Sequence, residues 1–253
     1  MIRKIKKYGW TPDLPDERDM PFRAAPHMLA NLPPKVDLRP GCPAVYDQGE
    51  LGSCTANAIG AAYQFEQIKQ DPEKDFTPSR LFIYINERIM EGSINQDNGA
   101  MIRDGIKSVA DQGVCPEIEW PYDISKFAAI PPAECYTHAM EHQVTSYMRI
   151  TPVLSEMKGC LAAGYPFVFG FTVYENFESQ DVAKTGIMHM PKGSAVGGHA
   201  VCAVGYDDTT KCVIVRNSWG AGWGAGGYFF MPYAYISNTN LADDFWTIRT
   251  VEL

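Results

Sequence analysis

Hydrophobic positions recur at helical spacing between about residue 35 and residue 142. A first helix is predicted over residues 54–70, with Ser53 as the expected N-cap. Small residues, among them Ala58 and Ala62, occur on several faces of this helix. A helix with small residues all round can approach its neighbours closely, so we expect it to be buried.

Two further helices are predicted in this first half. One begins at Pro78, because apolar residues such as Leu81 and Ile85 repeat at steps of four. The other begins at Met101 and ends at Gly113, a residue that commonly terminates helices.

The pattern changes after about residue 142, where short apolar runs alternate with turn residues. Five of these runs are predicted to be strands: residues 166–173, 199–206, 212–216, 227–231 and 245–250. One helix, over residues 153–163, interrupts them. A mainly helical half (about 35–142) followed by a mainly antiparallel β half (about 143–253) predicts an α+β fold with a cleft between the halves.

Residues 1–34 form a separate N-terminal segment. It contains six prolines, which exclude a long helix and favour an extended path over the surface. The basic run from Arg3 to Lys7 is interpreted as a solvated chain end.

Composition narrows the class of function. The formal charge of −8 argues against a nucleic-acid partner, since binding to phosphates needs clustered Lys and Arg. No apolar stretch approaches the ~20 residues of a membrane span, and the basic run has no apolar stretch after it. We therefore expect a protein that is cytoplasmic or exported by a non-standard route.

The seven cysteines are spread thinly along the chain, without the density of a disulfide scaffold. We expect most of them to be reduced. No CxxC pair suggests zinc, and His138 and His142, four residues apart, are interpreted as surface or capping residues. The sequence therefore predicts no metal site.

Candidate chemistry comes from three separated residues. Cys54 follows Gly52-Ser53 at the start of the first predicted helix, where an anion is favoured. His199 begins a predicted strand after a glycine pair, and Asn217 follows another strand and precedes Trp219. A thiol needs a base, and the base needs a third group to hold its ring. Alone, Cys54 would be interpreted as a buried structural cysteine, but together the three predict a cysteine nucleophile that is already ionised.

Two other polar residues bear on this site. Gln48 lies six residues before Cys54, across two glycines, and its amide can donate to the oxygen of an attacked carbonyl. Alone, it would be interpreted as a solvent-facing loop residue. His189 is a rival base, but its surroundings lack a comparable turn-to-strand setting. The tryptophan at position 219 is expected to pack over the bond between His199 and Asn217 and to exclude water.

These motifs resemble the papain family of cysteine peptidases, in its bacterial branch. The resemblance covers about residues 35–253 and rests on the following segments: Gln48-Gly49, Gly52-Ser53-Cys54, Gly198-His199-Ala200-Val201, Val204-Gly205-Tyr206, Asn217-Ser218-Trp219-Gly220 and Gly222-Trp223-Gly224. It implies a papain-like two-domain fold, with a helical domain and an antiparallel β-barrel-like domain on either side of the active-site cleft. It also implies a monomer that hydrolyses peptide or protein substrates without a metal or organic cofactor.

Carried over residue by residue, the resemblance makes Cys54 the nucleophile, His199 the general base and acid, Asn217 the orienting residue and Gln48 the oxyanion donor. Asn98-Gly99-Ala100 resembles the family's cleft-lining glycine pair, although Ala100 replaces the second glycine and a plain loop is the competing interpretation. Further substrate contacts are expected at four positions: Ile102, Phe171, Gly198 and Trp219.

The chain departs from the family pattern in three places. Thr55 replaces the aromatic residue that usually follows the nucleophile, and Leu51 replaces a disulfide cysteine. Only about 34 residues precede the peptidase domain, where many relatives have a long helical propeptide. We therefore expect residues 1–34 to act as a short propeptide or cleft cover.

Other functions remain open from sequence. The same thioester chemistry would serve an amide hydrolase or an acyltransferase acting on a non-peptide substrate. A silent peptide-binding homologue is a third reading, although such proteins often lack one member of the catalytic set. The complete set of Cys54, His199, Asn217 and Gln48 favours an active endopeptidase.

Overall fold

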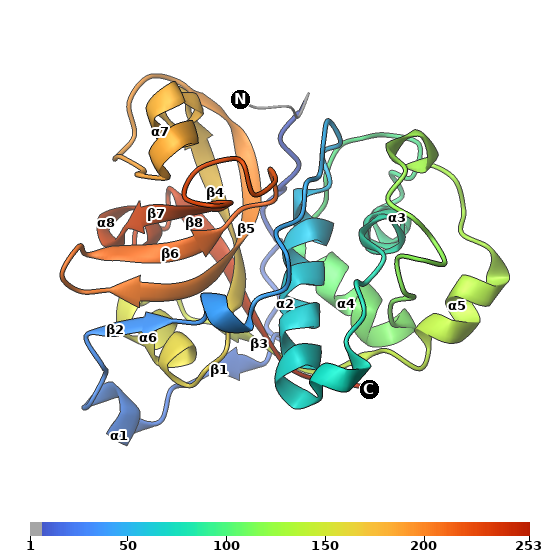
Figure 1. Cartoon of the computed structure of the whole chain (residues 1–253), viewed down its shortest axis with the longest axis horizontal. Helices are drawn as coiled ribbons and strands as arrows, with labels where there is room; N and C mark the ends of the chain where they lie inside the picture. Colours follow the sequence, from blue (N-terminus) through green and yellow to red (C-terminus); the bar gives the residue numbers. More distant parts are fainter. Residues whose placement is uncertain (1–6) are drawn as a thin grey trace.

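A computed structural model describes residues 7–253, and Figure 1 shows a helical half beside a sheet. The helices are α1 (Pro26–Leu29), α2 (Cys54–Gln70), α3 (Arg80–Met90), α4 (Ile102–Gln112), α5 (Ala133–Ala139), α6 (Leu154–Ala162), α7 (Gln180–Thr185) and α8 (Tyr233–Ile236). The strands are β1 (Pro21–Phe22), β2 (Lys35–Asp37), β3 (Val144–Ile150), β4 (Phe167–Tyr174), β5 (Ala195–Asp207), β6 (Cys212–Arg216), β7 (Tyr228–Pro232) and β8 (Ala242–Val251). The predicted α+β fold is confirmed.

Helix α2 lies between the sheet and the helices α3, α4 and α5 (Figure 1). Its alanine-rich surface and residues of α3 and α4 pack in one hydrophobic core with Val168, Ala200 and Trp246 of the sheet. A second core lies on the other side of the sheet and includes Phe169, Phe171 and Phe229. Small side chains on α2 allow it to lie close to both the sheet and the helices, as predicted.

Helix ends follow local chemistry, with one exception. Ser79 caps α3 by accepting a hydrogen bond from the backbone of Phe82, and Gly113 ends α4 with a φ of 73°. Ser53 was expected to cap α2, but it makes no side-chain capping bond. Its hydroxyl instead bonds to Tyr122 and Asn57, and that competing network accounts for the difference.

The strands form one sheet in the order β1-β3-β8-β4-β5-β6-β7, with β2 paired to β5. The strands after residue 143 pair antiparallel, as predicted, but the expected barrel-like closure is wrong. The sheet is open, because β1 and β7 are its ends and do not pair, and β1 runs parallel to β3. The long strand β5 pairs with β2, β4 and β6, and it carries His199 into the centre of the molecule.

The N-terminal segment runs between the helical half and the sheet (Figure 1). It is largely extended, as its prolines predict, and includes the one-turn helix α1 with Pro26 at its start. It does not simply cover the surface, because Tyr8 and Phe22 are buried. The basic run that begins at Arg3 lies mostly outside the described residues.

All seven cysteines are free, in agreement with the expectation of reduced thiols. Within residues 7–253, no helix is long and apolar enough to cross a membrane.

Candidate active site

Cys54 is the first residue of α2, and its side chain is completely buried. The backbone N–H of Ala200, on β5, donates to its Sγ atom at 3.3 Å. This contact joins the start of the central helix to the strand that carries His199. The two segments that were predicted to supply the nucleophile and the base therefore meet where the helical half faces the sheet.

His199 and Asn217 are joined by a hydrogen bond of 2.8 Å between Nε2 and Oδ1. The same amide oxygen accepts the backbone N–H of Ser218 at 2.9 Å, which fixes the orientation of the amide. Because an amide oxygen only accepts, the hydrogen of the neutral ring lies on Nε2 and its lone pair on Nδ1. Nδ1 is buried without a hydrogen-bond partner. The ring thus presents a free basic nitrogen.

Aromatic rings surround this imidazole. The Trp219 ring lies 5.1 Å from the His199 ring, centroid to centroid, at an angle of 30°. Phe171 of β4 meets the same ring edge-on at 5.8 Å. These contacts hold the imidazole and keep water from its bond to Asn217, as expected for position 219.

Gln48 is completely buried and held at both ends of its amide. Its Nε2 donates to the carbonyl of Leu51 at 2.9 Å, and its Oε1 accepts from the hydroxyl of Ser218 at 2.6 Å. The Tyr122 hydroxyl donates to the backbone carbonyl of Gln48 at 3.0 Å and also bonds to Ser53. No sequence pattern pointed to Tyr122, because it lies about 70 residues after Gln48 in the chain.

The N-terminal segment lies directly on the site. The backbone N–H of Trp10 donates to the carbonyl of Gly198 at 2.9 Å. On the opposite side, Ala100 donates to the carbonyl of Gly9 at 2.8 Å and accepts from Thr11 at 3.1 Å. Residues 9–11 therefore form a short strand bonded to both halves of the molecule.

The side chains of Tyr8 and Trp10 pack around the site. The Tyr8 ring meets His199 edge-on at 5.8 Å, and its hydroxyl donates to Glu178 at 2.7 Å. The indole of Trp10 lies against Gly170, where a Cβ atom would come within 1.9 Å of the ring, and its N–H donates to Asp244 at 3.1 Å. Sequence analysis missed these residues, although two aromatic side chains flanking a glycine in a Pro-rich segment are an available signal.

Burial sets the protonation of the site. It raises the pKa of the Cys54 thiol to about 12, although the N–H groups of Ala200 and Gly9 act in the opposite direction. Burial also lowers the pKa of His199 to about 4, against the effect of its bond to Asn217. Both groups are therefore neutral near pH 7. In this arrangement burial favours the neutral forms of both groups over the ionised thiol that the sequence predicts.

The other predicted substrate contacts fall into two groups. Ala100 and Gly198 bond to residues 9–11, and a Cβ atom at Gly99 would collide with the backbone of Gly9. Ile102 and Phe171 are completely buried within the hydrophobic cores. The rival base His189 is exposed and lies near Asp181, and no contact joins it to Cys54.

Comparison with known proteins shows the family to which the chain belongs. The sequence model for papain family cysteine proteases matches residues 32–246. An uncharacterised peptidase C1-like protein of Acanthamoeba polyphaga mimivirus is 46% identical, over 97% of this chain and 88% of the relative.

Solved structures agree as well. The crystal structure of xylellain, a cysteine protease from the bacterium Xylella fastidiosa, superposes with a TM-score of 0.91. It is 47% identical and covers 99% of this chain and 98% of its own. A procathepsin B from Trypanosoma congolense shares the fold, with a TM-score of 0.73 at 18% identity over 93% of this chain and 84% of its own.

Proposed function

Because the chain belongs to the papain family of cysteine proteases, we propose that it is an endopeptidase that uses Cys54, and that residues 8–11 hold it in a latent state. The observation that carries the proposal is the joint placement of Cys54 and His199. The thiol accepts a backbone N–H from Ala200, the residue that follows His199, and Nε2 of the His199 ring is held by Asn217.

The proposed reaction uses Sγ of Cys54 and the unbonded Nδ1 of His199. Nδ1 of His199 takes the Sγ proton of Cys54, and the thiolate attacks the carbonyl carbon of a peptide bond. The imidazolium then protonates the leaving amine, and a thioester remains on Sγ. Water gives a proton to Nδ1 as its oxygen attacks the thioester carbonyl carbon, the C–S bond breaks to release the carboxylic acid, and the imidazolium returns its proton to Sγ. Asn217 keeps the ring in the tautomer that this sequence requires.

Gln48 would stabilise the oxygen that becomes negative in each step. One Nε2 hydrogen bonds to Leu51, and an amide nitrogen carries a second hydrogen for the substrate. The backbone N–H of Cys54, at the first position of α2, is the other donor. Removing one such donor typically costs about 10²–10³-fold in turnover.

Residues 8–11, named the latch here, block this chemistry in three ways. Their bonds to Ala100 and Gly198 use backbone groups that an extended substrate would need. They bury the nucleophile and the base, which keeps both neutral. The backbone N–H of Gly9 also bonds to Sγ of Cys54, so the latch contacts the nucleophile itself.

The experiment compares full-length protein with protein lacking residues 1–11. This deletion removes Tyr8 and Trp10 but retains Asp13, whose carboxylate accepts from Trp246, and the strand β1. We expect a peptidyl epoxysuccinate to label Cys54 of the truncated protein quickly and the full-length protein slowly, as measured by intact mass and peptide mapping.

Peptide hydrolysis should follow the same order, and Cys54→Ala should abolish both labelling and hydrolysis while the fold is retained. Hydrolysis by Cys54→Ala would show that Cys54 is not the nucleophile. Equal labelling of full-length and truncated protein would show that residues 8–11 are not a latch and would leave the peptidase assignment in place.

A further inference from the structure

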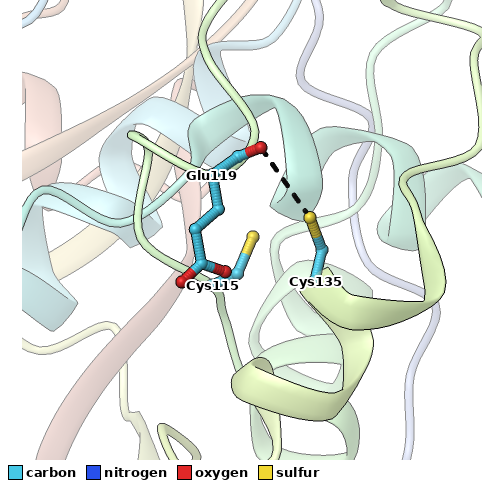
Figure 2. Close-up of side chains that lie close together, drawn as sticks. All are labelled: Cys115, Glu119 and Cys135. Carbon is cyan, nitrogen blue, oxygen red and sulfur yellow. Dashed lines mark hydrogen bonds between the residues drawn. The ribbon is translucent and has the colours of Figure 1, made fainter.

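Two buried thiols and a carboxylate come together away from the active site. Figure 2 shows the sulfur atoms of Cys115 and Cys135 directed toward a common space, with Glu119 beside them. The two sulfurs and a carboxylate oxygen of Glu119 all lie within 4.8 Å of one another. Both cysteines are free, with exposed fractions of 0% and 3%. The peptidase chemistry described above uses none of these groups.

The backbone holds these side chains in place. The carbonyl of Cys115 accepts from the backbone of Ser79, the capping residue of α3, at 2.9 Å. Cys135 lies in the first turn of α5, and its Sγ is 3.9 Å from the backbone carbonyl of Glu119. The donor atoms are therefore brought together by the fold before any ion arrives.

A fourth donor is adjacent. His138 follows Cys135 by three residues on α5, and its Nδ1 lies 3.0 Å from Oε2 of Glu119. The ring is about half exposed, so it can turn toward the sulfurs without unpacking a core. The sequence pattern is Cys115-x₃-Glu119 followed by Cys135-x₂-His138.

We infer that Cys115, Glu119, Cys135 and His138 form a site for a zinc ion. Two sulfurs, one oxygen and one nitrogen are donors that zinc accepts in tetrahedral sites. Thiolates are unsuitable for magnesium and calcium, which prefer oxygen ligands. With four protein donors the site is closed, so its role is structural.

Binding exchanges protons for the metal. Two S–H groups lose their protons to water and two sulfur–zinc bonds form, without any change of oxidation state. Because both thiols must lose their protons to bind, uptake should strengthen as the pH rises.

Zinc would fix the segment between Cys115 and Cys135. This segment carries Tyr122, which bonds to the backbone of Gln48 and to Ser53. The proposed ion would thus support the loop before the nucleophile from a distance, without contacting substrate.

The test uses full-length Cys54→Ala protein, which cannot digest itself, freed of metal by a chelator. Cobalt(II) is then titrated at pH 7.5 under reducing conditions. We expect one ion per chain with a thiolate-to-cobalt charge-transfer absorption, lost when zinc is added in equal amount. Cys115→Ser or Cys135→Ser should remove the absorption, and the half-exposed Cys212→Ser is the matched control that should retain it.

Glu119→Gln provides a second test if a serine variant fails to fold. Glu119 is partly exposed, so Glu119→Gln should fold normally, as measured by circular dichroism, and weaken cobalt binding about tenfold or more. Absence of the charge-transfer absorption in Cys54→Ala protein whose six remaining cysteines are all free thiols would overturn the zinc site. So would unchanged absorption in the serine variants. A protein mass lower by two hydrogens, with Cys115 linked to Cys135, would assign the pair to a disulfide instead.

Discussion

Two opposing effects act on the sulfur of Cys54. A helix N-terminus and a neighbouring imidazolium lower the pKa of a thiol. Removal of water raises it, and in the latched arrangement burial dominates for both Cys54 and His199. The sequence pointed to both residues, but their charge depends on what covers them and cannot be predicted from a local pattern.

This balance leads to a prediction on pH dependence. Deleting residues 1–11 returns water to both groups, so the thiol pKa should fall, the imidazole pKa should rise, and the ion pair should exist between them. We expect the rate of Cys54 alkylation by iodoacetamide to be high from mildly acidic to neutral pH in truncated protein. In full-length protein the rate should stay low and increase only at alkaline pH, where a thiol with a raised pKa ionises. If full-length and truncated protein had pH–rate profiles of the same shape, the latch would not determine the charge of Cys54 and His199.

The limits of the sequence are visible at single residues. Cys54, His199, Asn217 and Gln48 were identifiable because each sits in a local pattern of glycines and turns. Tyr122 and Asp244 could not be identified in this way, because no local pattern accompanies them. Tyr122 bonds to Gln48 across about 70 residues of chain, and Asp244 accepts from the Trp10 indole across about 230. Cys115 and Cys135, two of the proposed zinc ligands, form no sequence motif because 20 positions separate them, and His138 was interpreted from sequence as a surface or capping residue.

Among the elements, the clarity of the hydrophobic pattern determined what could be predicted. Helix α2 has its predicted bounds, and α3 and α4 lie close to their predicted positions. The strand β3 was not predicted, because its sequence mixes polar and apolar residues. Short elements such as α7 and β2 were not predicted, because a few residues carry no measurable period. The parallel pairing of β1 with β3 depends on a two-residue contact between segments more than 120 residues apart.

The latch is a short element held by few contacts, so single substitutions should open it. Trp10→Ala removes an indole packed against Gly170 and its bond to Asp244. Loss of this burial should raise the rate of Cys54 labelling by ~10-fold or more in full-length protein. Asp244→Asn should have a smaller effect in the same direction, because the amide oxygen can still accept one bond.

The matched control is Leu14→Ala, four residues further along the segment. The Leu14 side chain is 69% exposed, so its loss should leave the labelling rate unchanged. Equal rates for Trp10→Ala and Leu14→Ala would mean that the indole does not hold the latch closed.

For the whole molecule, buried carboxyl groups set the response to pH. Burial raises the pKa of Glu66 and Glu91 to about 7, and it raises that of Glu87 well above its ordinary value. These folded-state pKa values exceed those of the unfolded chain, so the folded protein binds more protons above pH ~4.5. Their contribution to stability is therefore present below that pH and is lost as the pH rises through the folded-state values.

Surface carboxylates act in the opposite direction at lower pH. A hydrogen-bonded Arg39 lowers the pKa of Asp37, and Lys35 does the same for Asp207. Their stabilising effect is present above the unfolded-state pKa and is lost as the pH falls below it. The two groups of carboxylates together place the stability maximum on the acidic side of neutral.

Glu87 provides the sharpest test of this balance. It is completely buried, accepts from the hydroxyl of Thr55 beside the nucleophile, and has a second oxygen without a hydrogen-bond partner. In the Cys54→Ala background, Glu87→Gln retains an acceptor for Thr55 and cannot ionise. We expect its Tm to decline less than that of the parent between pH 5 and pH 8, measured by calorimetry. A change of 1 kcal/mol moves the Tm of a domain of this size by ~2–4 °C, so the difference is measurable. The exposed Glu73→Gln should follow the parent curve, and parallel curves for Glu87→Gln and the parent would show that Glu87 has an ordinary pKa in the folded protein.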